Sequence, residues 1–191
     1  MARNKEFEVH TVLGKAMDVF WEKGYEKTSM QDLVTQMGVH RRSIYDTFGD
    51  KHELFMQVID RYDELVVTPI HHSADGLPSA KQAIRHIFER TIRKKEQSPR
   101  GCLMVNTAVE LAVHDEEAAA KVNQSFGKTE AKFQELVELG LKSGEIGGGR
   151  DAQKLSQFLN NALLGLRVLV KTTDNREKLQ GIVDITMSVL D

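Results

Sequence analysis

The chain has 191 residues, of which 40% are hydrophobic and 28% are charged, and its formal net charge is −2. This composition is ordinary for a globular protein, and the length suits one large domain or two small ones with a shared core. No apolar run approaches the roughly 18–20 residues that a membrane helix needs. The N-terminus carries charges where a signal peptide has its apolar stretch, so we expect a cytoplasmic protein. A single cysteine, Cys102, excludes an intramolecular disulfide and a cysteine-based zinc cluster.

The overall charge gives no indication of nucleic-acid binding. The first sixty residues hold eight Lys/Arg against ten Asp/Glu. By composition alone this balance argues against a DNA-binding protein. Whether the protein binds DNA must therefore be judged from the positions of the positive charges along the chain.

The N-terminal third shows three closely spaced helical segments. Apolar residues at helical spacing predict a first helix over about 5–23, which Gly24 ends as a C-cap. A hydroxyl cap at Thr28 or Ser29, with Asp32 three residues on, opens a second short helix. Only Gly38 and Val39 separate this helix from a third over 40–47. Two short helices joined by a tight glycine-containing turn indicate a helix-turn-helix.

The rest of the chain also reads as helix. Asp50 and Glu53 form a second cap pair, which opens a helix through about Val67, and a loop is expected over 71–76. Further helices are predicted near 79–97, 101–113, 115–144, 151–172 and 175–190. The three prolines fall at breaks between these segments, and alternating strand patterns are absent. We therefore predict an all-α fold of about nine helices.

An ordered set of residues extends over about 45 positions of the N-terminal part. It consists of the segments 20–29 (FWEKGYEKTS), 38–48 (GVHRRSIYDTF) and 51–55 (KHELF). Together they resemble the tetracycline-repressor (TetR) family of regulators, whose pattern has these elements in this order. Three positions depart from it: His40 stands where Ser or Thr is common, Arg42 where a small residue is common, and His52 where Glu is common. Because these positions are on the DNA-facing side, they bear on the operator sequence rather than on the fold.

The resemblance implies a domain organisation and a function. Residues 5–66 would form a three-helix DNA-binding domain, with its helix-turn-helix at about 29–48, and residues 67–191 a helical effector-binding and dimerisation domain. A homodimer would bind a near-palindromic double-stranded operator and act as a repressor that a small-molecule effector releases. Two alternatives remain open: an activator on the same fold, and a helical ligand-binding or protein-interaction module with no operator binding.

The third helix is the predicted recognition helix. Ile44 and Phe48 are spaced for core packing, which leaves polar and basic side chains for DNA. An arginine in the major groove can pair with guanine, worth about 1–3 kcal/mol of discrimination, but the sequence does not say which arginine does so. The resemblance implies phosphate contacts near the helix N-termini. The candidate DNA-binding residues are Thr28, Ser29, His40, Arg41, Arg42, Ser43, Tyr45 and Lys51. The alternative is that Arg41 and Arg42 form only a solvated helix face.

The last two helices are strongly apolar. Such helices need burial, and the family builds its dimer interface from them as a four-helix bundle. The alternative is that they pack wholly inside one subunit. The candidate interface residues are Leu155, Leu159, Leu163, Leu166, Leu179, Ile182, Val183 and Val189.

An effector pocket is expected among the helices between 50 and 170. The segment 100–111 places polar groups among apolar neighbours and resembles a Gly-Cys-Leu segment of a TetR subgroup. The candidate pocket residues are Phe88, Ile92, Cys102, Met104, Asn106, Thr107, Glu110, Phe126, Phe133 and Phe158. For the aromatic side chains, a place in the core is the competing interpretation. Cys102 is either a small buried apolar group or, with Arg100 beside it, an electrophile-sensing thiol.

No pattern in the sequence predicts an enzyme, a cofactor or a metal. His71 and His72 lack carboxylates at ligand spacing, and Glu110 with His114 does not repeat as a di-metal helix motif would. There is no phosphate-binding glycine loop and no nucleophile elbow. We expect a regulator without a cofactor.

Overall fold

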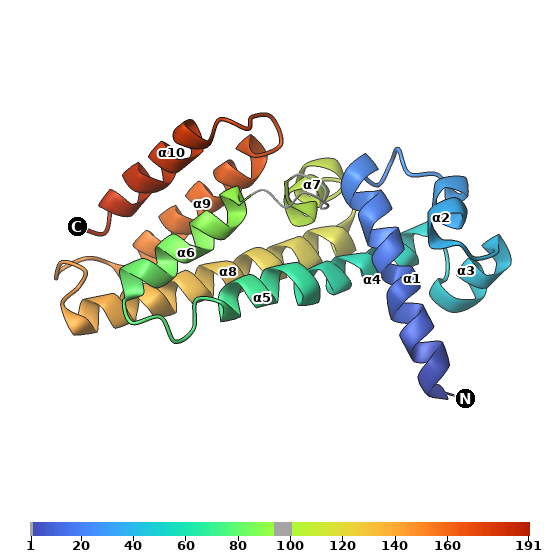
Figure 1. Ribbon diagram of the computed structural model, residues 1–191, viewed down its shortest axis with the longest axis horizontal. Coiled ribbons are helices and arrows are strands. Elements are labelled where there is room, and N and C mark those ends of the chain that lie inside the picture. Colours follow the sequence, from blue (N-terminus) through green and yellow to red (C-terminus); the bar gives the residue numbers. More distant parts are fainter. Residues whose placement is uncertain (1, 94–100) are drawn as a thin grey trace. The chain divides into compact units, whose positions relative to one another are not determined.

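The computed structural model describes residues 2–93 and 101–191, with side chains from residue 9 onward. Every regular element in this part of the chain is a helix (Figure 1), which confirms the predicted all-α class. The chain divides into two compact units. Unit 1 comprises residues 1–66 and 102–122, and unit 2 comprises residues 67–101 and 123–191. Residues 102–122 therefore group with the N-terminal residues, whereas the sequence placed them in the C-terminal domain.

Unit 1 is built around the predicted helix-turn-helix. Its helices are α1 (Ala2–Lys23), α2 (Met30–Met37), α3 (Arg41–Phe48), α4 (Lys51–Tyr62), α7 (Leu103–Glu110) and the first turns of α8 (Glu116–Ser143). Helix α1 packs on both α2 and α4. The rings of Phe20 and Phe55 meet edge to face, 4.8 Å apart, in a core that also buries Leu33, Ile44 and Leu54. This packing fixes the angles at which α2 and α3 leave the unit's surface.

The local sequence explains where these short helices begin and end. Ser29 accepts a hydrogen bond from Asp32 N while Asp32 accepts one from Ser29 N, and Asp50 and Glu53 do the same at the start of α4. Both pairs confirm the predicted caps and satisfy amide groups that would otherwise lack a partner. Gly38 closes α2 with a φ of 71°, in the left-handed region that glycine tolerates best.

The helical run that starts at Lys51 is longer than the sequence indicated. A π-helical segment, Asp63–Val67, follows α4 and leads directly into α5 (Thr68–His72). The prediction of a break at Pro69 and a loop from His71 was wrong. Pro69 lies in the first turn of α5, where its missing N–H leaves no helical hydrogen bond unmade. Among the described residues, α5 and the π-helical segment are therefore the two elements that the prediction of nine helices did not contain.

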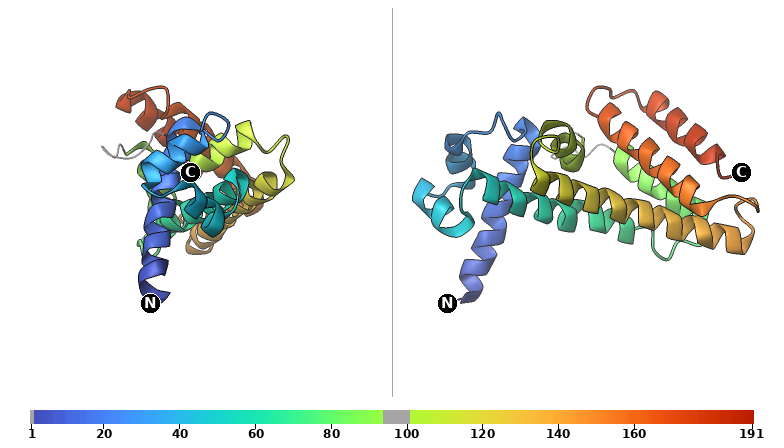
Figure 2. Two further views of the ribbon diagram at one scale, coloured as in Figure 1. Left: turned by 90° about the vertical axis from the view of Figure 1, so that its right-hand side faces the viewer. Right: turned by 180° about the vertical axis from the view of Figure 1, so that it is seen from behind.

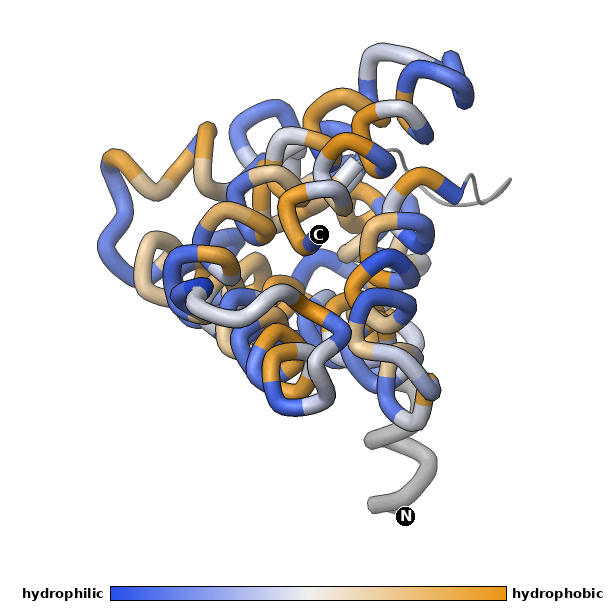
Figure 3. The backbone as a smooth tube through the Cα atoms, turned by 90° about the vertical axis from the view of Figure 1, so that its left-hand side faces the viewer, coloured by the Kyte–Doolittle hydropathy of each residue, from blue (hydrophilic) through white to orange (hydrophobic). Residues whose placement is uncertain are grey.

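Unit 2 contains α5, α6 (Ala80–Ile92), the remainder of α8, α9 (Ala152–Leu169) and α10 (Arg176–Ser188). Helices α6, α9 and α10 lie side by side (Figures 1 and 2). Orange and blue alternate along the helices in Figure 3, as in amphipathic helices that turn one face inward. The shared core includes Ile84, Phe88, Phe133, Leu163 and Val183. The predicted extension of α6 to residue 97 falls partly outside the described residues.

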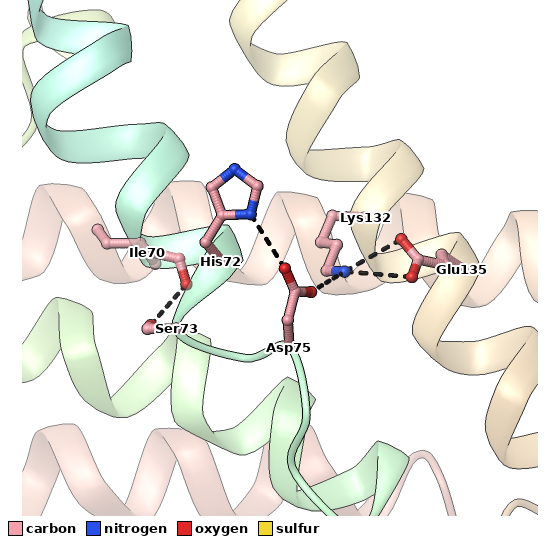
Figure 4. Close-up of polar contacts among 6 residues, drawn as sticks. All are labelled: Ile70, His72, Ser73, Asp75, Lys132 and Glu135. Carbon is pink, nitrogen blue, oxygen red and sulfur yellow. Dashed lines mark hydrogen bonds and ion pairs between the residues drawn. The ribbon is translucent and has the colours of Figure 1, made fainter.

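Polar contacts tie the end of α5 to α8 within unit 2 (Figure 4). Lys132 Nζ donates to Asp75 Oδ1 at 2.6 Å and to Glu135, and His72 Nδ1 lies 3.0 Å from Asp75 Oδ2. The hydrogen bond from Lys132 is the main reason that the pKa of Asp75 lies below its usual value, with His72 second. His71 and His72, which the sequence placed in a loop, are thus helical residues with polar partners.

Candidate nucleic-acid interface

Helix α3 presents a polar surface because its apolar residues all point into the core. Ile44 is 0% exposed and Phe48 is 5% exposed, which confirms their predicted packing. The remaining positions at and after the helix start are exposed: His40, Arg41, Arg42, Ser43, Tyr45, Asp46 and Thr47. His40 is the N-cap residue but makes no side-chain cap bond, so its ring is not used by the helix itself. Two arginines, an imidazole and a phenol therefore share the outer face of an eight-residue helix.

The two arginines make only weak contacts with their own helix. Arg41 lies over the ring of Tyr45, with Cζ 5.8 Å from the ring centroid and Nη2 3.4 Å from the hydroxyl. Arg42 Nε is 3.6 Å from Asp46 Oδ2, in a pair whose side chains are 92% and 67% exposed. Exposed pairs of this kind contribute about 0–1 kcal/mol. Both guanidinium groups can therefore leave these partners for a base edge or a phosphate.

The side chains expected near phosphate lie in different environments. Ser29 is exposed at the start of α2, beside amide groups and a helix dipole that favour an anion. Lys51, at the start of α4, has its Nζ 4.3 Å from the centroid of the Tyr25 ring. Thr28 is only 1% exposed, and its hydroxyl donates to Gly24 O at 2.6 Å. The Thr28 side chain thus stabilises the turn after α1, and we do not include it in the proposed interface.

Asp32 lies close to this surface, but its negative charge is paired with Lys23. Lys23 Nζ donates to Asp32 Oδ1 at 2.6 Å, and Ser29 adds hydrogen bonds from its hydroxyl and its N–H. These contacts, led by the one from Lys23, hold the pKa of Asp32 far below its usual value. The carboxylate therefore stays ionised and paired, so that its repulsion of a phosphate at the α2 N-terminus is reduced.

Glu110, at the end of α7, holds the turn between α1 and α2. Its Oε2 accepts a hydrogen bond from Tyr25 N at 3.0 Å, and its Oε1 accepts one from Glu26 N at 2.9 Å. Gly24 permits this contact: its φ is +84°, and a Cβ there would lie 2.8 Å from Glu110 Oε2. The sequence assigned Glu110 to the effector pocket. The structure instead places its carboxylate on the backbone of the DNA-binding unit.

Two further polar links join residues 115–121 to α4 within unit 1. His52 Nε2 lies 2.7 Å from Asp115 Oδ2, and Lys121 Nζ donates to Asp60 Oδ1 at 2.6 Å. The pKa of Asp115 is lowered first by the hydrogen bond from Ala118 N and then by the one from His52. Sequence reasoning missed these pairs. The one signal was His52 itself, which departs from the family's common Glu and here meets a carboxylate.

The predicted effector residues are divided between the two units. Cys102, Met104, Asn106, Thr107 and Glu110 lie in unit 1, and Phe88, Ile92, Phe126, Phe133 and Phe158 lie in unit 2. The Phe88 and Phe133 rings stack in the core of unit 2, 5.6 Å apart, whereas Phe158 is 46% exposed. Cys102 is buried at the start of α7, and Arg100, its expected neighbour, lies outside the described residues. A single pocket lined by all ten residues therefore stays a prediction.

The residues predicted for the dimer interface are mostly core residues of unit 2. Leu159, Leu163, Leu166, Leu179 and Val183 are at most 4% exposed, while Leu155, Ile182 and Val189 are half-buried against the same core. Side chains that are already covered within one subunit cannot supply much new burial against a partner. The exposed apolar side chains of α9 and α10 are different residues: Phe158, Val168 and Ile185. The sequence predicted the helical spacing of these apolar residues, but the residues that it assigned to the dimer interface lie on the side of α9 and α10 that faces the core of unit 2.

The described residues were also compared with what a metal site and a membrane-spanning helix require. In this part of the chain, no group of three or more His, Cys, Asp or Glu side chains is placed to hold a metal ion. Within the same residues, no helix combines the length and the apolar character that crossing a membrane requires.

The two parts of the chain match two family descriptions. Residues 12–58 match the model for bacterial regulatory proteins of the tetR family, and residues 80–185 match the tetracyclin repressor-like C-terminal domain. The chain is similar to the uncharacterized HTH-type transcriptional regulator YezE of Bacillus subtilis (strain 168), with 35% identity over 194 residues that cover 100% of each chain. It is also similar to the HTH-type transcriptional repressor ComR of Escherichia coli (strain K12), with 29% identity covering 97% and 90% of the two chains.

Solved structures show the same architecture. The TetR family transcriptional regulator CifR, in complex with 26-base-pair double-strand operator DNA, matches with a TM-score of 0.86 and 28% identity over 95% of each chain. A TetR family regulator from Cytophaga hutchinsonii matches the fold with a TM-score of 0.88 and 16% identity, covering 100% and 96% of the two chains. An exposed basic helix held in a helix-turn-helix, followed by a helical domain, defines a DNA-binding transcriptional regulator. The chain belongs to the TetR family of these regulators.

Proposed function

We propose that the protein is a homodimeric repressor that binds a near-palindromic DNA operator and is released from it by a small-molecule effector. The outer face of α3 carries this proposal: Arg41, Arg42 and Tyr45 are exposed together on a helix whose other side is buried. In this arrangement the arginines read base edges in the major groove, and His40 and Ser43 contact the same groove or its phosphates.

Phosphate contacts would fix the orientation of this helix on the duplex. Ser29 lies at the N-terminus of α2 and Lys51 at that of α4, where amide groups favour an anion. Such contacts set register without reading sequence. The similarity to ComR, a transcriptional repressor, and to the operator-bound structure of CifR supports operator binding by this chain.

The dimer would form through the outer faces of α9 and α10. Phe158, Val168 and Ile185 leave apolar surface there, with Ile185 74% exposed. Packing these helices on a second copy would bury that surface in a two-fold, self-complementary interface. A two-fold dimer also suits an operator with two half-sites roughly 34–36 Å apart.

Effector release would act through residues 102–122. This segment contacts the DNA-binding helices through Glu110, Asp115 and Lys121. An effector whose affinity differs between two arrangements of this segment shifts the population towards the one that it favours, and by linkage the operator weakens effector binding by the same factor. Regulation without an enzymatic step and a cytoplasmic location are parts of the same proposal.

Selection of DNA from a random-sequence library tests the proposal and identifies the operator in the same experiment. The expected result is an enriched sequence with two inverted half-sites about one helical turn apart. A matched selection with the Arg41→Ala/Arg42→Ala variant should enrich no such sequence. A library that stays random after selection with intact dimer would contradict operator binding.

A further inference from the structure

A stripe of three buried polar residues runs along α9 in unit 2. Ser156 is 0% exposed, and Asn160 and Arg167 are each 6% exposed. At 3.6 residues per turn, the three positions fall within about 40° of one another around the helix. They lie beside Leu159, Leu163 and Leu166, which are part of the apolar core. A helix that only packed a core would carry apolar residues at these positions too.

Two members of this stripe, Asn160 and Arg167, each have a polar group without a partner among the described residues. Ser156 is satisfied, because its hydroxyl donates to Gln153 O at 2.8 Å. Asn160 Nδ2 donates to Phe126 O at 3.4 Å, but the buried Oδ1 of Asn160 has no hydrogen-bond partner. Arg167 is only 6% exposed, and its guanidinium has no hydrogen-bond or ion-pair partner within residues 9–93 and 101–191. An unsatisfied buried acceptor such as Asn160 Oδ1 is unfavourable, and an arginine that is only 6% exposed has little water around its charge. Both side chains can therefore gain hydrogen bonds from a ligand.

The chemistry of these two side chains defines what would satisfy them. A guanidinium is always charged and presents a fork of N–H groups that matches a carboxylate. An amide oxygen accepts a hydrogen bond from a hydroxyl or an N–H. The two positions are seven residues apart, which corresponds to about 10 Å along the helix. Leu164 lies between them, within about 60° of both around the helix, and is half-buried, so it can contact an apolar chain.

We propose that Arg167 and Asn160 bind the effector, and that this effector is an organic carboxylate with an apolar body and a hydrogen-bond donor at its far end. The carboxylate pairs with Arg167, the donor satisfies Asn160 Oδ1, and the body lies along α9 beside Leu164. This inference rests on the proposed effector-released function and gives its ligand a chemical class. Neither residue was among those that the sequence indicated for the pocket.

Calorimetric titration of the full chain, without DNA, tests the assignment with three probes of one length. They are ω-hydroxydecanoate, decanoate and the corresponding ten-carbon diol. The hydroxy acid should bind most tightly, because it alone offers both groups. Arg167→Met should weaken both acids by about tenfold or more and leave the diol unchanged. Asn160→Leu should abolish only the advantage of the hydroxy acid over decanoate.

Two controls separate a ligand contact from a structural role. Arg176→Gln removes an exposed arginine at the start of α10 and should leave all three affinities unchanged. Melting of the ligand-free Arg167→Met variant gives the second control. If Arg167 is unpaired in the free protein, its removal leaves the melting temperature unchanged or raises it, whereas breaking a buried ion pair lowers it strongly.

Three results would overturn the assignment: no acid binding by the wild-type chain, equal acid binding by Arg167→Met, or a large loss of stability in that ligand-free variant. Failure of this inference is distinguishable from failure of the proposed function, because operator binding is measured separately on DNA. A chain that binds the acids but selects no operator would refute the repressor proposal alone.

Discussion

Removal of the Glu110 carboxylate should destabilise the DNA-binding unit by a predictable amount. In the wild-type chain this carboxylate accepts hydrogen bonds from Tyr25 N at 3.0 Å and Glu26 N at 2.9 Å. A hydrogen bond to a charged group contributes about 1.5–3 kcal/mol. In Glu110→Ala, the exposed N–H of Glu26 regains a bond to water, whereas the partly buried N–H of Tyr25 does so less well.

The expected loss is therefore that of one charge-assisted bond, about 2 kcal/mol of unfolding free energy. For a chain of this length, that corresponds to a fall in melting temperature of about 4–8 °C. Urea unfolding followed by circular dichroism measures the free energy, and calorimetry measures the melting temperature. Glu110→Gln keeps one acceptor oxygen and should fall between the wild type and Glu110→Ala.

The matched control is Glu22→Ala, which removes an exposed glutamate from α1 of the same unit. Exposed substitutions without partners usually change stability by less than about 0.5 kcal/mol. The reasoning would be refuted if Glu110→Ala were as stable as Glu22→Ala, or if Glu110→Gln were as unstable as Glu110→Ala. Either result would mean that α7 does not hold the turn through this carboxylate.

Three further predictions concern neighbouring features. Gly24→Ala should destabilise by about 1–2 kcal/mol from its left-handed backbone alone, and by more while Glu110 crowds the new Cβ, so the cost should be smaller in a Glu110→Ala background. Because the pKa of Asp32 is lowered in the folded chain, its stabilising contribution is present above its unfolded pKa of about 3.9 and is lost progressively as the pH falls from there towards the lowered value. The urea midpoint of Asp32→Asn should therefore differ less between about pH 7 and about pH 3 than the midpoint of the wild type does. Ile185→Glu should convert the dimer to monomer in sedimentation analysis, whereas Leu139→Glu, at an exposed apolar position on α8, should leave it dimeric.

Much of the fold could be read from local sequence because local interactions determine it. The capping pairs Ser29–Asp32 and Asp50–Glu53 mark the starts of α2 and α4, and both pairs form as hydrogen-bonded boxes. Periodicity likewise identifies Ile44 as a core residue. The passage of the chain through Pro69 could not be read in this way, because a proline signals a break whether it ends a helix or begins a new one after a π-helical segment.

The site residues that sequence reasoning missed depend on contacts between distant parts of the chain. Nothing near Glu110 in the sequence indicates that it meets residues 25 and 26, and Asp115 gives no sign of His52. The faces of α9 and α10 posed a different difficulty. Apolar residues lie on more than one side of each helix, so the pattern showed that burial was needed. It did not show which side of α9, that of Leu163 or that of Phe158, was already covered within the subunit.

The central claim is that α3 reads an operator through its exposed arginines. Fluorescence anisotropy of the selected operator, titrated with wild-type protein and with Arg41→Ala/Arg42→Ala at rising salt, tests this claim most directly. We expect specific binding that weakens steeply with salt in the wild type, and in the variant the loss of the preference for operator over random DNA. A variant that keeps both its dimeric state and its full operator preference would contradict the account and favour a module whose helix-turn-helix does not read DNA.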